Sequence, residues 1–183
     1  MKYYTILLFI ALLLCPVCVN SQTENHSDSV EVIKDWEDLY HLGRFYISGQ
    51  PELDELAWMK EQGVTTIINL RSHKENKEFA GDSFDEKEEI NKLGLTYFSI
   101  PIQGREGYTP ENLDDMINAI GNDQKVLIHC ASGGRATQLF MAYLVKAEGY
   151  SIDEAVQAGK QMLYYIPLES LLDTRIFLDD HSK

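Results

Sequence analysis

The stretch of sequence that decides the fold is residues 126–146, VLIHCASGGRATQLFMAYLVK. It begins with a short apolar run that ends at Cys130, as expected for a buried central strand. A turn with two adjacent glycines follows, and Arg135 closes it. Residues 136–146 are apolar nearly all round after Gln138, which is typical of a central, buried helix. The stretch therefore predicts a strand, a tight loop and a helix in immediate succession.

The 130–135 loop has the composition of an anion-binding site. A strand end places Cys130 at the carboxyl edge of the sheet, where α/β folds bind ligands. The glycines let backbone N–H groups point into one concavity, and the helix start adds free N–H groups and a positive dipole end. The guanidinium of Arg135 can hold two oxygens of a phosphate. Cysteines in such settings have a pKa of roughly 3.5–7.5, so Cys130 is the predicted nucleophile. The alternative for a lone thiol is an inert core cysteine.

The rest of the chain alternates between strand-like and helical runs, which predicts an α/β fold. We expect a central, mainly parallel sheet of about four to five strands flanked by helices. The predicted strands cover residues 45–48, 65–70, 96–100 and 126–130.

The predicted helices have clear start signals. One opens at Pro51 and carries Leu53, Leu56 and Ala57 inward. A charged surface helix covers 85–93. Two further helices follow the cap Thr109 with Pro110 and the capping box Ser151 with Glu154.

The first 21 residues have the pattern of an export signal. Lys2 precedes an apolar run that Pro16 interrupts, and a small residue, Ser21, suits cleavage before Gln22. A membrane anchor is the alternative, but it needs about 20 apolar residues. We expect a signal peptide over 1–21, a flexible lead-in over 22–29 and a single domain over 30–183. The protein would be exported, periplasmic or secreted, without a stable membrane span after cleavage.

Charge and composition limit the partners. The chain has a net charge of −13, and cleavage after Ser21 leaves 15 basic and 29 acidic residues. Nucleic acid and anionic membranes would be repelled by such a surface, so neither is an expected partner. Cleavage also removes Cys15 and Cys18 and leaves Cys130 as a lone cysteine. The five histidines have no ligand spacing, so neither a metal nor another cofactor is indicated. No feature of the sequence fixes the oligomeric state.

The loop and its surroundings carry a family resemblance. His129-Cys130, the two glycines and Arg135 resemble the signature of protein tyrosine and dual-specificity phosphatases. That signature has one residue more between cysteine and arginine, and the shorter spacing here resembles a subgroup of bacterial phosphatase-like domains that includes the beta-lactamase-hydrolase-like ones. Residues 46–51, 63–71, 94–97 and 100–102 also resemble the pattern of that subgroup, in the same order. The resemblance covers about residues 44–146 and implies a cysteine-phosphatase-like fold.

The resemblance also implies an activity. It is the hydrolysis of a phosphomonoester, on a protein or a small molecule, through a cysteinyl-phosphate intermediate. Cys130 would attack the phosphorus and Arg135 would stabilise the oxyanion. The implied phosphate-binding residues are Ala131, Ser132, Gly133, Gly134, Arg135 and Ala136.

Three departures from the family pattern affect the site. The loop is one residue short, which makes it narrower. Ala136 stands where family members place a hydroxyl that helps the cysteine to leave, and Thr137 is the candidate replacement. Gln103 stands where they carry an aspartate general acid. We predict Glu106 as the proton donor instead, with a solvated loop glutamate as the alternative.

Other residues of the predicted site have two readings. His129 either orients the loop or is a satisfied core histidine. Arg71 either supports the loop or the ligand, or pairs with a carboxylate structurally. Arg105 could recruit an anionic substrate. Tyr108 and residues 164–167 could line a pocket, although aromatic side chains at such positions more often pack in the core.

Two other functions compete with a phosphatase. The cysteine-to-arginine spacing also matches rhodanese-type sulfurtransferases, whose smaller loop holds a cysteine persulfide. A catalytically weak module that captures an oxyanion would explain the missing aspartate and the displaced hydroxyl. Residues 48–51 and 68–71 favour the phosphatase.

Overall fold

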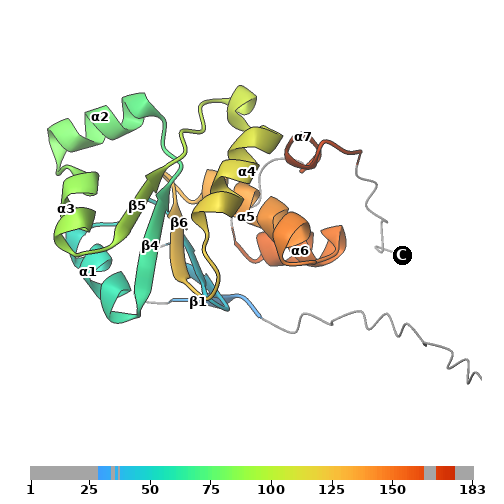
Figure 1. Ribbon diagram of the computed structural model, residues 1–183, viewed down its shortest axis with the longest axis horizontal. Coiled ribbons are helices and arrows are strands. Elements are labelled where there is room, and N and C mark those ends of the chain that lie inside the picture. The colour runs from blue at the N-terminus through green and yellow to red at the C-terminus, as the bar shows by residue number, and fades with distance from the viewer. Residues whose placement is uncertain (1–28, 34–35, 37, 163–167, 176–183) are drawn as a thin grey trace, which may run out of the picture.

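Parallel strands form the centre of the sheet (Figure 1). The computed structural model describes residues 29–33, 36, 38–162 and 168–175. Within this part of the chain, six strands pair in the spatial order β1-β2-β3-β6-β4-β5. The pairs β3–β6, β6–β4 and β4–β5 are parallel, whereas β1–β2 and β2–β3 are antiparallel. The strands are β1 (Glu31–Val32), β2 (Tyr40–Leu42), β3 (Phe45–Ser48), β4 (Val64–Asn69), β5 (Thr96–Ser99) and β6 (Lys125–His129).

Helices cover both faces of this sheet. On one face pack α1 (Leu53–Glu61) and α3 (Glu86–Lys92). On the other pack α4 (Pro110–Ala119), α5 (Gly134–Ala147), α6 (Ile152–Lys160) and α7 (Glu169–Leu172). The remaining elements are α2 (His73–Asp82), after β4, and the short 3₁₀ helix η1 (Arg105–Gly107), after β5.

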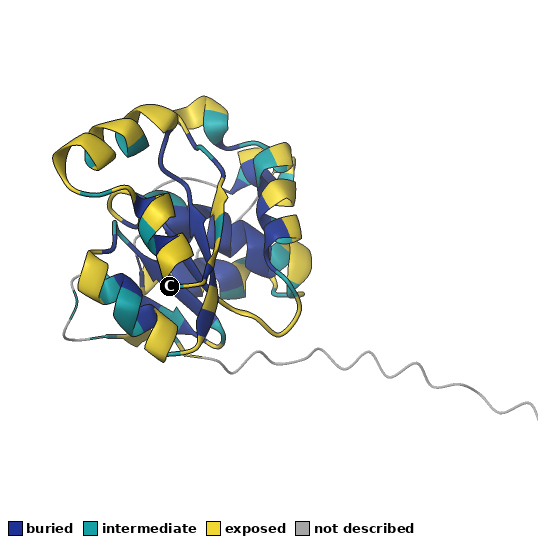
Figure 2. Cartoon of the chain, turned by 60° about the vertical axis from the view of Figure 1, so that its left-hand side comes forward, coloured by how far each residue is buried: buried dark blue, intermediate teal, exposed yellow. Residues whose placement is uncertain are grey.

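Two apolar cores result from the alternation of side chains along the strands. The neighbours Ile67 and Ile68 in β4 are both fully buried, yet Ile67 packs with α1 and α3 and Ile68 with α4 and α5. Figure 2 shows the inner strands of the sheet and the adjoining helix in the buried colour, and the edge strand β5 and the outer helices largely in the exposed colour. The molecule is thus a three-layer α/β structure, and the predicted fold class is confirmed.

The central helix α5 is the most buried helix of the described chain. Every residue from Ala136 to Leu144 is buried, which confirms the prediction from its apolar sequence. All four predicted strands exist within one residue of the expected bounds. The antiparallel strands β1 and β2 were not predicted, because they are too short to show a periodic pattern.

The inward face of α1 differs from the prediction. Leu53 is 48% exposed, whereas Leu56 and Met59 are fully buried and Ala57 is half-buried. The reason is that the helix starts at Leu53 with Glu52 as its cap, so Leu53 lies in the first turn and does not reach the sheet. The prediction that Leu53 faces inward was therefore wrong.

A polar cluster at the amino end of β3 links the sheet to the end of α5. Arg44 donates to Tyr143 and Glu148, each at 3.0 Å, and to the Gly121 carbonyl at 2.8 Å. Tyr143 also donates to Glu148, and its pKa is raised, first by burial and then by that carboxylate. We call Arg44, Tyr143 and Glu148 the Arg44 cluster. It stabilises the edge of the sheet opposite to Cys130.

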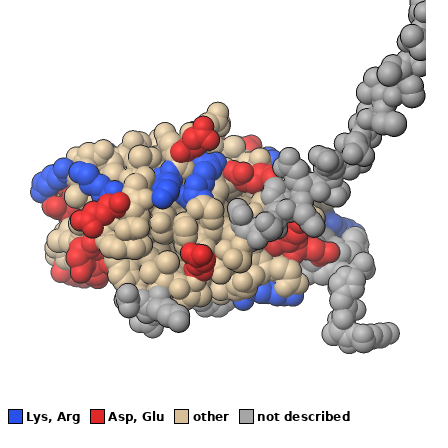
Figure 3. All heavy atoms as spheres, turned by 90° about the horizontal axis from the view of Figure 1, so that it is seen from below, with Lys and Arg blue, Asp and Glu red and all other residues tan. Residues whose placement is uncertain are grey.

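Charges of both signs share the molecular surface. In the view from below, basic and acidic side chains alternate instead of forming one acidic patch (Figure 3). In the part of the chain that the structure describes, no helix is both long and apolar enough to span a bilayer.

The packing of α6 on α5 predicts a glycine requirement. A Cβ added at Gly159 would lie 1.9 Å from the sulfur of the fully buried Met141. Gly159→Ala should therefore lower the free energy of unfolding by about 1–3 kcal/mol, measured by urea denaturation. Gly81, in α2, has no atom within 4 Å of an added Cβ. Gly81→Ala is the control and should be neutral or stabilising by up to about 1 kcal/mol. Equal effects of the two substitutions would contradict this packing.

Candidate active site

Cys130 lies directly after β6, between the sheet and the start of α5. The chain reverses at Gly133, which has a φ of +79° in the left-handed region that favours glycine. Of the two adjacent glycines, this one meets the conformational requirement, because Gly134 is already helical. The first helical bond runs from the Thr137 amide to the Gly133 carbonyl. The amides of Gly134, Arg135 and Ala136 therefore belong to the free N–H groups of a helix start.

The end of β3 holds the first half of the loop. The Cys130 amide donates to the Ser48 carbonyl at 3.4 Å, and the Gln50 amide donates to the Ala131 carbonyl at 3.2 Å. A Cβ at Gly49 would lie 3.3 Å from the Ala131 oxygen, so the two backbones come close only because Gly49 has no side chain. This contact explains the Ser-Gly-Gln sequence that the resemblance singled out.

The thiol lies beneath the surface. Cys130 is 1% exposed, whereas Ala131 and Ser132 are exposed and Ala136 is buried. Burial raises the pKa of Tyr108, and the charge of Cys130 raises it further. The pKa of Arg135 is raised, first by Glu75 and also by Cys130, with which it shares a hydrogen bond. Arg135 is therefore a polar neighbour of the sulfur, and Tyr108 lies with Cys130 in the same core cluster.

Arg135 forms a two-pronged ion pair with Glu75. Its two terminal nitrogens donate to the two Glu75 oxygens at 2.8 and 2.6 Å, and one also donates to the Ile102 carbonyl at 2.9 Å. The Arg135 contact lowers the pKa of Glu75 to about 2, and hydrogen bonds from Ser72 contribute. A carboxylate thus occupies the guanidinium fork that the sequence assigns to an oxyanion.

Neither Glu75 nor the helix α2 that carries it was predicted from the sequence. This helix has no buried residues, so it shows no apolar stripe. It does have a capping box, in which the Ser72 hydroxyl accepts from the Glu75 amide and the Glu75 carboxylate accepts from the Ser72 amide. The Ser-x-x-Glu spacing is a recognisable start signal and could have revealed both the helix and the carboxylate.

A pocket of about 460 Å³ opens beside Arg135. Gln103, Arg105 and Tyr108 contribute to its wall, so two arginines face one carboxylate, Glu75. Among the described residues, the lining is Ser72, Glu75, Ile102, Gln103, Gly104, Arg105, Tyr108 and Arg135.

Glu106, the predicted proton donor, is exposed in η1 and does not line this pocket. Its neighbour Arg105 does. The structure thus brings Gln103 and Arg105 to the pocket and leaves Glu106 outside its wall.

Arg71 lies beneath the start of α2. It donates to the Gln50 side chain and to the Glu75 carbonyl at 3.1 Å, and its guanidinium lies 4.8 Å from the centre of the Phe79 ring. The side chain is 9% exposed. Of the alternatives, these contacts favour support of the loop over contact with a ligand.

His129 and Thr137 are both fully buried. The Nε2 atom of His129 lies 3.2 Å from a Glu86 oxygen, and burial lowers the His129 pKa. The Thr137 hydroxyl has no hydrogen-bond partner among the described residues. Its predicted role as the replacement hydroxyl stays a prediction.

A metal site is not apparent in residues 29–33, 36, 38–162 and 168–175. No three His, Cys, Asp or Glu side chains lie together there in a way that could hold an ion. The leader, the cleavage site and residues 164–167 lie outside the described residues.

Solved structures with the same architecture are cysteine phosphatases, which defines the class of fold. The chain is similar to Tk-PTP in its active form, with 22% identity and a TM-score of 0.62 over 75% of this chain and 98% of that one. It is also similar to the core catalytic domain of the PP-IP phosphatase SIW14 from S. cerevisiae, with 18% identity and a TM-score of 0.55 over 68% and 75% of the two chains.

The sequence comparison is more specific. The pattern of the family described as "DSP-PTPase phosphatase fused to NAD+ Kinase" matches residues 20–169, and this chain belongs to that family. A beta-lactamase hydrolase-like protein of Xylella fastidiosa is 35% identical over 98 residues, which are 53% of this chain and 22% of the relative. The match thus covers about a fifth of the curated relative. The resemblance drawn from the loop motif is confirmed.

The ion pair of Glu75 and Arg135 predicts a pH dependence. The Glu75 pKa falls from 4.5 to about 2 on folding, so the stabilisation is fully present above pH 4.5 and is lost as the pH falls through 2. Wild type should exceed Glu75→Gln in free energy of unfolding at pH 6, and the difference should shrink below pH 4.5. Urea denaturation across this range measures it. Glu78→Gln, an exposed change on the same helix, is the control, and a pH-independent difference for Glu75→Gln would refute the pairing.

Proposed function

We propose that this protein is a cysteine-dependent phosphatase that hydrolyses a phosphomonoester, on a protein or a small molecule, through a cysteinyl-phosphate intermediate. The observation that carries the proposal is the position of Cys130 at the carboxyl end of β6, under the first turn of α5 and beside Arg135. Family membership and the phosphatase fold support it. The site would give the thiolate and the phosphoryl oxygens the same positive surroundings.

The first step is displacement at phosphorus. The Cys130 thiolate supplies the electron pair for a new S–P bond, while the bond between phosphorus and the ester oxygen breaks. Arg135 and the amides of Gly134 and Ala136 would stabilise the equatorial oxygens. A proton from a general acid goes to the departing alcohol oxygen.

The second step regenerates the enzyme. Water attacks the cysteinyl-phosphate, the S–P bond breaks with its electrons returning to sulfur, and inorganic phosphate leaves. The buried Thr137 hydroxyl is the candidate for stabilising the departing thiolate. Its lack of a partner among the described residues is consistent with that role.

Substrate binding requires an exchange of anions at Arg135. Two oxygens of a phosphoryl group can replace the two Glu75 oxygens in the guanidinium fork, because carboxylate and phosphate present matching pairs of acceptors. The thiol is only 1% exposed, so movement of Arg135 or Tyr108 would also open the path to sulfur. Arg105 on the pocket wall would attract the substrate despite the acidic net charge.

Export remains part of this proposal. The apolar leader and the small residue before Gln22 support a protein that acts outside the cytoplasm. Its lone mature cysteine then has a catalytic explanation.

One observation favours a second candidate, an oxyanion-binding module with weak turnover. Glu106 lies outside the pocket wall and Gln103 replaces the usual acid, so Glu75, which is paired, is the one carboxylic acid among the described residues that line the pocket. Inorganic phosphate would then raise the melting temperature without hydrolysis of any ester. For the sulfurtransferase alternative, release of thiocyanate from thiosulfate and cyanide without phosphatase activity is the expected result.

Substitution of the nucleophile tests the mechanism. Cys130→Ser should lower kcat on p-nitrophenyl phosphate by at least about 1,000-fold, because the hydroxyl is a far weaker nucleophile at neutral pH. Phosphate binding, measured by calorimetry, should change little. Glu111→Gln, an exposed change in α4, is the control for folding. Activity that survives Cys130→Ser would refute the nucleophile assignment.

The choice of leaving group tests the general acid. Glu106→Gln should lower kcat about 100-fold for an alkyl phosphate, whose alkoxide needs a proton, and much less for p-nitrophenyl phosphate. Steady-state kinetics with both substrates measures the difference. Glu111→Gln, an exposed change in α4, is the control. Equal losses for both substrates would exclude Glu106 as the acid.

A further inference from the structure

A buried carboxylate lies on the face of the sheet opposite to α5. Glu86 is the first residue of α3 and is only 6% exposed. The charged composition of residues 85–93 predicts a surface helix, and this prediction is wrong for Glu86, which is buried. Its neighbour Glu88 is exposed and pairs with Lys92, as expected for a surface residue. Burial of a carboxylate is costly unless hydrogen bonds compensate it.

Three hydrogen-bond donors and the ring of His129 surround this carboxylate. Gln50 donates to one oxygen at 2.6 Å, and the His129 Nε2 atom lies 3.2 Å from the same oxygen. Asn69 and the Tyr97 hydroxyl donate to the other, the latter at 3.4 Å. We call Gln50, Asn69, Glu86, Tyr97 and His129 the Glu86 cluster. Asn69 and His129 are the last residues of β4 and β6, Gln50 follows β3 by two residues, and Tyr97 lies within β5, so one side chain contacts residues of all four parallel strands or of their connections.

The chemistry of the cluster requires a carboxylate. Only a carboxylate has acceptor sites on both oxygens and no hydrogen to direct at its partners. A glutamine of the same shape would point an amide N–H₂ at two of the donors. A buried ion is weak evidence for stability, because apolar packing often serves as well. The burial of a charged Glu86 therefore indicates that its role is to fix the relative positions of the strands that it contacts.

Two chains of contacts lead from Glu86 to the 130–135 loop. In the first, His129 is followed directly by Cys130, and the Gln50 amide holds the Ala131 carbonyl. In the second, the Gln50 side chain accepts a hydrogen bond from Arg71. Arg71 also donates to the backbone carbonyl of Glu75, and Glu75 is the residue that binds Arg135. Both the nucleophile and the arginine thus depend on the Glu86 cluster.

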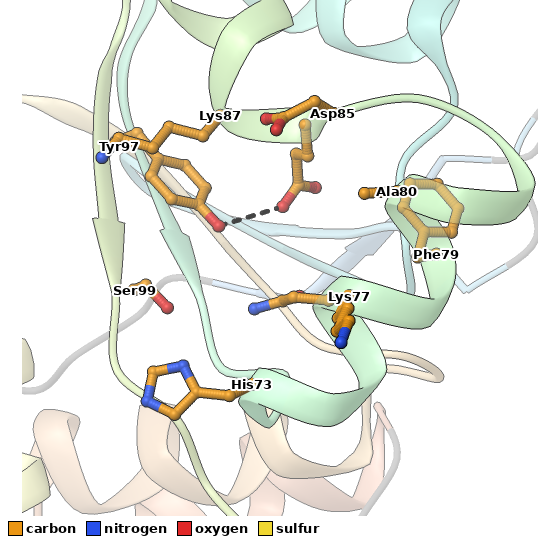
Figure 4. Close-up of a pocket in the computed structure, with 10 residues that line it drawn as sticks. His73, Lys77, Phe79, Ala80, Asp85, Lys87, Tyr97 and Ser99 are labelled. Atoms are coloured by element: carbon orange, nitrogen blue, oxygen red, sulfur yellow. Dashed lines mark hydrogen bonds between the residues drawn. The ribbon is translucent and has the colours of Figure 1, made fainter.

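A cavity of about 570 Å³ gives solvent access to this cluster between α2 and α3 (Figure 4). The dashed line in Figure 4 marks the bond from the Tyr97 hydroxyl to the Glu86 carboxylate. The charge of Glu86 raises the Tyr97 pKa in addition to burial, which acts first. The titratable and charged groups around the cavity and the cluster are His73, Lys77, Asp85, Lys87, Tyr97, His129 and Arg71.

We propose that Glu86 is a positioning residue: it ties β5, through Tyr97, to the carboxyl ends of β4 and β6 and to the segment after β3, so that the loop amides and Arg135 stay directed at Cys130. The inference rests on the proposed function of the loop. It assigns to Glu86 no contact with substrate. It predicts that loss of the carboxylate disorders the charge-stabilising geometry around the thiol.

The test is the reactivity of the thiol in the full chain. Iodoacetamide alkylation is followed by mass spectrometry of the tryptic peptide 126–135, whose only cysteine is Cys130. The pH at which the rate is half-maximal is determined for wild type and for each variant. Glu86→Gln should move that pH upward by about one unit or more. Loss of the negative charge alone would favour the thiolate and move it downward, so an upward shift reports lost positioning.

The matched control is Glu148→Gln, which removes a carboxylate of the Arg44 cluster at the opposite edge of the sheet. It should destabilise the fold without moving the half-maximal pH. An unchanged or lower value for Glu86→Gln, or an equal upward shift for Glu148→Gln, would overturn the inference. A wild-type value at that of free cysteine would instead contradict the proposed function of the loop.

A second substitution covers the case in which Glu86→Gln does not fold. Gln50→Ala leaves the carboxylate in place and removes its contact with the end of β3. The half-maximal pH should again rise, by less than for Glu86→Gln. No shift in folded Gln50→Ala, verified by circular dichroism, would also overturn the inference.

Discussion

The reversal of the chain between β6 and α5 is the constraint on which the rest of the structure depends. The connection is so short that the first turn of the helix must begin against the end of the strand, and Gly133 provides the backbone conformation that allows it. A buried helix then needs a fixed position, which the apolar residues from Ala136 to Leu144 supply on both sides. The free amides of the helix start are thereby brought to Cys130 by the same packing that stabilises the core.

The site contains more acidic groups than its proposed chemistry would suggest. Glu75 pairs with Arg135 at the wall of the pocket, and Glu86 is buried on the face of the sheet opposite to α5. These two carboxylates differ in function because they differ in surroundings. Glu75 is partly exposed and its partner can bind another anion, whereas Glu86 is enclosed by donors from the sheet itself. An acidic chain can therefore keep a local site for a phosphate without a broad basic surface.

Local sequence patterns predicted the centre of this structure well. They failed where contacts between residues far apart in the sequence determine the position of a side chain. The apolar run ending at Cys130 and the all-round apolar helix after it fixed two adjacent elements and the candidate loop. The buried position of Glu86 could not be predicted, because a helix with five charged residues in seven has the composition of a surface element. Its burial becomes favourable only because Gln50, Asn69 and His129, which lie far from it in the sequence, surround it in the folded chain. Glu75 is different, since the capping box at Ser72 was readable and was overlooked.

The double use of Glu75 has a consequence for α2. One carboxylate closes the first turn of this helix through Ser72 and at the same time pairs with Arg135, a residue 60 positions away. A ligand that withdraws the guanidinium therefore changes the electrostatic environment of a helix start that it does not touch. By thermodynamic reciprocity, whatever orders or frays that turn must also change the affinity of Arg135 for anions. The outer helix with no buried residue is thus energetically part of the binding site.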